Sequence, residues 1–143
     1  MTMPQTYATH RRVDPWYHYL LTSAALLALV LAVFALFRRP GLQEAFALVI
    51  ALTAILLTLK VRSYALRVQD RVIRLEETLR MQRILPVDLQ GRIQELTPGQ
   101  FVALRFASDA ELADRVREAL DQGLRGEVIK TRIQQWRPDH FRV

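Results

Sequence analysis

A chain of 143 residues is long enough for one ordinary domain, or for a small membrane anchor joined to a small soluble module. The chain has no cysteine, which excludes a disulfide framework, a thiolate nucleophile and a cysteine-ligated metal site. The net charge of +6 lies within residues 1–83, whereas residues 84–143 carry nine basic and nine acidic side chains; this neutrality argues against nucleic acid as a partner.

The N-terminal stretch THRRVDPWYHYLL, residues 9–21, has the composition expected where a helix enters a membrane. Asp14 is predicted to cap the first helix, with Pro15 at its first position. Aromatic side chains favour the membrane surface, and arginines hold a segment on the cytoplasmic side. The residues predicted at the membrane interface are Arg11, Arg12, Trp16, Tyr17 and Tyr19 before the first span, and Lys60 and Arg62 after the second.

The apolar run from Tyr19 to Phe37 has nineteen residues and no charge, close to the ~20 residues that cross a bilayer. A cleaved signal peptide is the alternative, but no A-x-A-like site follows and a second apolar run comes next. That second run, Ala45 to Leu59, reaches a spanning length when it is extended to Leu42 and Val61, with Glu44 and Lys60 reaching outward to the headgroups. Pro40 and Gly41 mark a short turn, so we expect an antiparallel transmembrane hairpin.

The positive-inside rule places both termini in the cytoplasm. Arg11 and Arg12 precede the first span and Lys60 and Arg62 follow the second, although Arg38 and Arg39 in the connecting turn favour the opposite orientation. The chain is therefore expected to cross a membrane twice.

Neither glycine nor proline occurs between Leu59 and Pro86, so the second span is expected to continue as one helix from about Gln43 to about Ile84. The projecting part carries apolar residues at alternating spacings of four and three, the pattern of a coiled-coil seam. The seam consists of Val61, Ala65, Val68, Val72, Leu75 and Leu79. It either packs within the chain, against the C-terminal helices, or contacts a partner or a second copy. Glu76 and Arg80 have the spacing of an exposed helical ion pair.

Three short helices are expected after Pro86. Thr97 and Pro98 open the first, and Ser108 with Glu111 forms a capping box that opens the second. Gly123 and Gly126 end that helix and precede the third. The apolar stripes are Leu112, Val116, Ala119 and Leu120 in the second helix, and Val128, Ile129, Ile133 and Trp136 in the third. Three helices of this size have little hydrophobic core of their own. Docking onto the projecting helix would complete that core.

Residues that could carry chemistry are few. The three histidines His10, His18 and His140 lack metal-ligand spacing, and the neighbours Asp139 and His140 have no accompanying nucleophile. Transport normally requires ionisable groups at membrane depth, whereas the polar residues of the two apolar runs are Thr22, Ser23, Thr53 and Thr58. We therefore expect no catalytic residue, no metal, no cofactor and no small-molecule substrate.

The predicted fold class is an all-α membrane protein, a two-helix transmembrane hairpin whose second helix extends into the cytoplasm and is followed by a small helical module. The predicted segments are a cytoplasmic N-terminal segment (1–18), transmembrane helix 1 (19–37), a short turn (38–44), transmembrane helix 2 (45–61), a projecting amphipathic helix (62–85) and a cytoplasmic helical module (86–143).

Several stretches resemble a bacterial family of small two-span inner-membrane proteins known only as a domain of unknown function. The stretches are RVQDRVIRLEETLR (67–80), LPVDLQGRIQELTPGQFVALRFASDAEL (85–112) and WRPDHFRV (136–143), with His10, Arg12, Pro15, His18 and Tyr19 near the start. The resemblance implies an inner-membrane location and brings no catalytic or binding residue.

The expected function is that of a non-catalytic membrane protein, a structural or accessory subunit of a larger inner-membrane complex. A respiratory or photosynthetic complex is a conceivable host, although no residue selects it. The alternative is a membrane-anchored signalling or regulatory module that self-associates through the projecting helix. The expected partners are membrane lipid and either other subunits of the complex or a second copy.

Overall fold

The computed structural model describes residues 6–7 and 14–139, and in them the regular elements are all helices. The elements are the π-helix η1 (Trp16–Leu21), α1 (Thr22–Arg38), α2 (Leu42–Ile84), α3 (Val87–Gln90), the 3-10 helix η2 (Ile93–Glu95), α4 (Pro98–Leu104), α5 (Asp109–Asp121) and α6 (Gly126–Arg132). The chain forms two compact units, and α2 contributes to both. The described part of the first is residues 14–66, and that of the second is residues 6–7 and 67–139. The predicted all-α class is confirmed.

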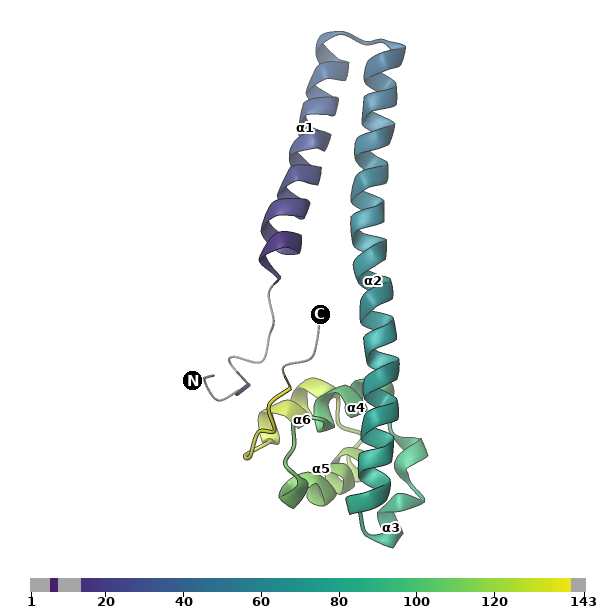
Figure 1. Cartoon of the computed structure of the whole chain (residues 1–143), viewed down its shortest axis with the longest axis vertical. Coiled ribbons are helices and arrows are strands. Elements are labelled where there is room, and N and C mark those ends of the chain that lie inside the picture. The colour runs from purple at the N-terminus through teal and green to yellow at the C-terminus, as the bar shows by residue number, and fades with distance from the viewer. Residues whose placement is uncertain (1–5, 8–13, 140–143) are drawn as a thin grey trace. The chain divides into compact units, whose positions relative to one another are not determined.

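The first unit is a hairpin of two long apolar helices packed together (Figure 1). As predicted, Asp14 caps the first helix, because its Oδ1 accepts hydrogen bonds from the backbone N–H groups of Trp16 at 3.0 Å and Tyr17 at 3.4 Å. The helices Trp16–Arg38 and Leu42–Ile84 are long and apolar enough to cross a membrane. Only 11% and 6% of the residues in their apolar stretches are buried, so they do not resemble the core helices of a soluble protein.

Helix α2 runs for 43 residues without a break, within one residue of the predicted bounds. Residues with good helix propensity fill it, and the last backbone hydrogen bond, from Leu85 to the carbonyl of Met81, comes directly before Pro86. A proline disfavours the helical conformation of the residue before it, which explains why α2 ends there.

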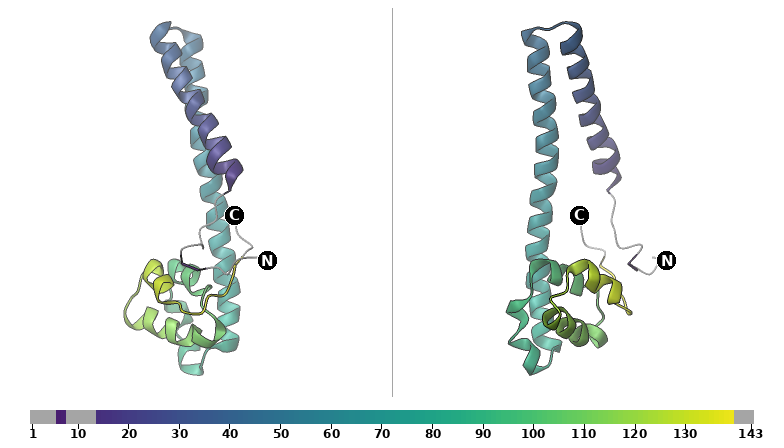
Figure 2. Two further views of the ribbon diagram at one scale, coloured as in Figure 1. Left: turned by 90° about the vertical axis from the view of Figure 1, so that its left-hand side faces the viewer. Right: turned by 180° about the vertical axis from the view of Figure 1, so that it is seen from behind.

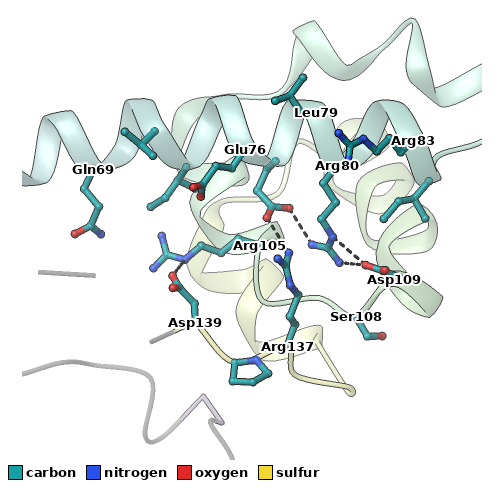
Figure 3. A pocket seen from close by; sticks show the side chains of 15 residues that line it. Gln69, Glu76, Leu79, Arg80, Arg83, Arg105, Ser108, Asp109, Arg137 and Asp139 are labelled. Carbon is teal, nitrogen blue, oxygen red and sulfur yellow. Dashed lines mark hydrogen bonds and ion pairs between the residues drawn. The ribbon is translucent and has the colours of Figure 1, made fainter. Parts of the chain in front are cut away.

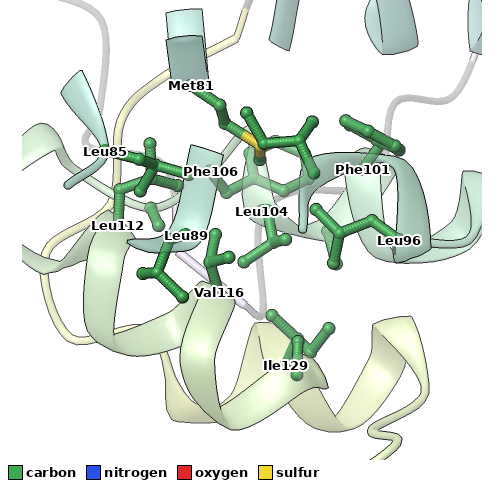
Figure 4. Packing of buried hydrophobic residues seen from close by; sticks show 14 of the residues in the cluster. Met81, Leu85, Leu89, Leu96, Phe101, Leu104, Phe106, Leu112, Val116 and Ile129 are labelled. Atoms are coloured by element: carbon green, nitrogen blue, oxygen red, sulfur yellow. The ribbon is translucent and has the colours of Figure 1, made fainter. Parts of the chain in front are cut away.

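The second unit folds α3–α6 around the C-terminal end of α2, as the views in Figure 2 show. Its core joins Met81 and Leu85 to residues of the following segments, among them Phe101 of α4, Phe106 of the next turn and Leu112 of α5 (Figure 4). The expected docking of the module onto the projecting helix is therefore confirmed, and Met81, with no exposed surface, is the main contribution of α2 to this core.

The predicted starts of these helices are correct, but the cap predicted at Ser108 and the predicted extent of the last helix are not. Thr97 caps α4 in a capping box with Gln100, and Gly123 ends α5 with a positive φ of 59°. At Ser108, by contrast, the predicted capping box is absent, because Glu111 accepts hydrogen bonds from the backbone of a later segment instead. Helix α6 ends at Arg132 and leaves the last part of the predicted stripe outside it.

The side of α2 that docks is not the predicted seam. Ile73, Glu77 and Met81 are buried, whereas Val68, Val72, Leu75 and Leu79 keep exposed fractions of 62%, 48%, 62% and 47%. At 100° per residue the two sets point about 170° apart on the helix. Packing of the seam within the chain is therefore wrong for these four residues, and contact with a partner stays a prediction.

A close approach between α4 and α6 predicts that Gly126 is sensitive to substitution. A Cβ at Gly126 would lie 2.6 Å from the carbonyl oxygen of Gly99, so we expect Gly126→Ala to force the helices apart and cost about 1–3 kcal/mol. Hydrogen exchange of the α4 and α6 amides in the full chain measures this as faster local opening.

The matched control is Gly91→Ala, because no atom lies within 4 Å of the added Cβ and the backbone there is compatible with alanine. It should leave exchange unchanged or slow it slightly. Equal effects of the two substitutions would contradict the close approach.

Candidate functional site

A pocket of about 1290 Å³ lies beside α2 in the second unit (Figure 3). Its charged lining residues are the bases Arg80, Arg83, Arg105 and Arg137 and the acids Glu76, Glu77, Asp109 and Asp139. These charges balance, so the pocket does not select an anion or a cation by net charge. What distinguishes the pocket is the way in which its charges are paired.

Glu77 is the centre of this pairing and is buried, which is rare for a carboxylate. Its two oxygens accept from different arginines: Oε2 from Arg80 Nη1 at 2.9 Å, and Oε1 from Arg137 Nη1 at 3.0 Å. Arg80 also donates from Nε to Asp109 at 2.9 Å and from Nη2 to the carbonyl of Ala107 at 2.7 Å. The cluster ties α2 to two segments that are distant in sequence.

One of these segments is an extended stretch, residues 133–139, that we call the C-terminal strap. Its backbone pairs with the loop before α5: Ser108 N–H donates to the carbonyl of Gln135 at 3.0 Å, and Arg137 N–H donates to that of Phe106 at 2.7 Å. Glu111 accepts from the N–H groups of Gln134 and Gln135 at 3.1 and 3.0 Å. The carboxylate expected to cap α5 therefore holds the strap.

Side chains of the strap add to its attachment. The ring centroids of Trp136 and Phe106 lie 5.0 Å apart, so Trp136 packs on the core. It does so from the strap, whereas the sequence predicted it on a helix. Asp139 forms an ion pair with Arg105 at 2.9 Å, and Arg105 is itself buried. Asp139 is thus engaged in a structural contact, and its sequence neighbour His140 lies outside the described residues.

Glu76, directly beside Glu77, has a different environment. The predicted pair between Glu76 and Arg80 does not form, because Arg80 turns to Glu77 and Asp109. Glu76 is exposed, and within residues 14–139 it makes no ion pair. Sequence spacing could not distinguish the two carboxylates, since both lie within one turn of Arg80.

Elsewhere on the module, ion pairs lie at the surface. Arg92 donates to Asp121 at 2.9 Å and to Glu95 at 3.3 Å, and hydrogen bonds to these two carboxylates raise the pKa of Arg92 above its usual value. Among the described residues, no three His, Asp or Glu side chains are grouped to hold a metal ion. The predicted absence of cofactors and of catalysis stays a prediction.

The residues predicted at the membrane interface are only partly gathered in the structure. Trp16, Tyr19 and Lys60 are exposed. Tyr17 instead turns toward the other helix of the hairpin: its hydroxyl donates to the carbonyl of Thr58 at 3.2 Å, and the guanidinium of Arg62 lies 4.8 Å from its ring centroid. Arg11 and Arg12 lie outside the described residues, and the interface role of the whole set stays a prediction.

The sequence was also compared with known proteins. No curated protein and no solved structure matches the chain. One family model matches it, over residues 1–143, and its description is a family of unknown function, DUF6526. The match agrees with the resemblance seen in the sequence and covers both the hairpin and the module. The chain therefore belongs to the family of unknown function DUF6526.

Proposed function

We propose that the protein is a non-catalytic integral membrane protein of the bacterial inner membrane and acts as a structural or accessory subunit of a larger complex. The observation that carries this proposal is the uncovered apolar face of α2. Val68, Val72, Leu75 and Leu79 are about half exposed or more on a helix whose opposite side is already covered by the chain's own module. An apolar row of this kind outside a membrane-length stretch is typical of a contact surface.

The distribution of charge supports the location. Beyond the second apolar run, α2 carries Lys60, Arg62 and Arg67, while the module is neutral. Under the positive-inside rule this places the module in the cytoplasm, and Arg62 near Tyr17 suits a membrane surface. The hairpin then serves as an anchor, and the module serves as the part presented to other subunits.

Purification from native membranes in mild detergent tests the proposal. We expect a tagged full-length chain to elute with other membrane subunits at a constant ratio through two different separations, with masses measured by native mass spectrometry. The control is the tagged chain added to solubilised membranes after lysis, which should not acquire the same subunits. Elution as a lone monomer, or as an oligomer of this chain alone, would contradict the accessory role.

A regulatory module is the second candidate, and the Glu77 cluster favours it. Arg137 attaches the C-terminal strap to α2 through the buried carboxylate of Glu77. A movement of α2 at this turn would therefore weaken the attachment of the strap. This candidate requires that the strap opens while the core stays folded, which hydrogen exchange of the strap amides measures.

A further inference from the structure

We propose that the exposed seam of α2 between Val68 and Leu79 is the contact between two copies of this chain, which pair in parallel and in register. This inference rests on the proposed function in one respect, that α2 is anchored in a membrane. It adds the identity of the partner at the seam, which is a second copy of this chain, so that the protein would enter a larger complex as a dimer.

The seam has the register of a two-stranded coiled coil. Its spacing places Val72 and Leu79 at a positions and Val68 and Leu75 at d positions of a heptad. A β-branched residue at a with leucine at d favours two parallel strands. Val72 and Leu75 have this arrangement, whereas Leu79 at a and Val68 at d reverse it. The module docks through Ile73, Glu77 and Met81, which occupy the b, f and c positions on the outer side. The a residues Val72 and Leu79 border the pocket beside α2, but all four seam residues keep about half or more of their surface exposed.

The charges that flank the seam fit a second copy in this register. In a parallel pair, each g residue faces the e residue five positions later in the other helix. Arg71 is at g and Glu76 is at e, so each copy would offer its arginine to the other copy's carboxylate. The other two such pairings join Tyr64 to Gln69 and Thr78 to Arg83, and neither opposes like charges. Arg71 and Glu76 make no ion pair with residues of the described chain, so both are available.

Membrane anchoring supplies what a short seam lacks. Fewer than three heptads are marginal for an independent coiled coil in solution. Two copies of α2 that leave the same membrane point the same way, which selects the parallel arrangement and raises their effective concentration. An antiparallel pair would require the two anchors to lie in opposed membranes.

Cysteine cross-linking in native membranes tests the contact, because the full-length chain has no cysteine of its own. In a parallel two-fold pair each seam position faces itself, so Val68→Cys, Val72→Cys and Leu79→Cys should each give a disulfide-linked dimer under mild oxidation. The control is Arg67→Cys, exposed on the same helix but at an outer position. Cross-linking of the three seam variants no greater than that of Arg67→Cys overturns the proposal.

A charge exchange tests the register without touching the seam. Arg71→Glu places two acids against each other twice in the dimer, and should weaken dimerisation about ten-fold, measured as energy transfer between labelled copies diluted in lipid vesicles. Adding Glu76→Arg to the same chain should restore it, because the pairs are then reversed. Both positions are exposed, so folding of the module is not at risk. Failure of the double variant to recover would overturn the parallel register.

The results separate this inference from the proposed function. A cross-linked dimer that purifies without other subunits supports the inference and contradicts the accessory role. A stoichiometric complex that holds one copy of the chain supports the accessory role and overturns the inference.

Discussion

Met81→Asp is expected to release the C-terminal module from α2. Met81 is fully buried in the core that α2 shares with the following helices. The substitution removes its apolar contacts and places an unpaired carboxylate among apolar neighbours, at a combined cost of more than about 5 kcal/mol. A unit of this size has little more stability than that. Limited proteolysis of the full chain should then show new cleavage between residues 86 and 99.

Leu79→Asp is the matched control, because it adds the same side chain two residues earlier on the same helix. Leu79 is exposed on the opposite side of α2, so this variant should keep the resistance of the module to protease. Met81→Leu, which conserves volume and polarity, should also behave like the parent chain. Comparable cleavage of the Met81→Asp and Leu79→Asp variants would contradict the docking face.

Glu77→Gln is expected to loosen the C-terminal strap while the core stays folded. The substitution keeps the size of the side chain but removes the charge that holds Arg80 and Arg137. Removing one partner of a buried ion pair costs several kcal/mol; here Arg80 keeps Asp109 and Arg137 is half exposed, so we expect about 2 kcal/mol. The Ser108 and Arg137 amides form the hydrogen bonds between the strap and the loop before α5. Their hydrogen exchange should become about 30-fold faster.

Glu76→Gln is the control for this experiment, since it makes the same change at the neighbouring exposed carboxylate. It should leave hydrogen exchange of the strap amides unaltered and weaken only the pairing of two copies. Glu77→Gln should instead speed exchange of the strap amides and leave the pairing of two copies unaltered. Equal exchange rates in both variants would show that the buried carboxylate does not hold the strap.

Features that depend on neighbouring residues were predictable. The length of α2, the cap at Asp14, the start of α4 after Thr97 and the end of α5 at Gly123 all follow from local propensities and turn chemistry. The two apolar helices were predictable for the same reason, because length and composition alone indicate a membrane-crossing segment.

The face of α2 that docks could not be chosen from the sequence. Both sides of the helix carry apolar residues, and the more regular row, Val68 to Leu79, is the exposed one. The buried row consists of Ile73, Glu77 and Met81. A glutamate in a sequence indicates an exposed position, and only the structure shows that Arg137 pairs with it. A buried charge is acceptable only with its partner in place.

The sequence by itself determined the extent of α2, the start of α4 and the end of α5, because capping, helix propensity and turn chemistry act over a few residues. Only the tertiary structure decided the roles of Glu77, Glu111 and Asp139. Apart from Arg80, which is three residues from Glu77, their partners lie between 23 and 60 residues away along the chain. No local spacing relates residues so far apart until the core has brought their segments together.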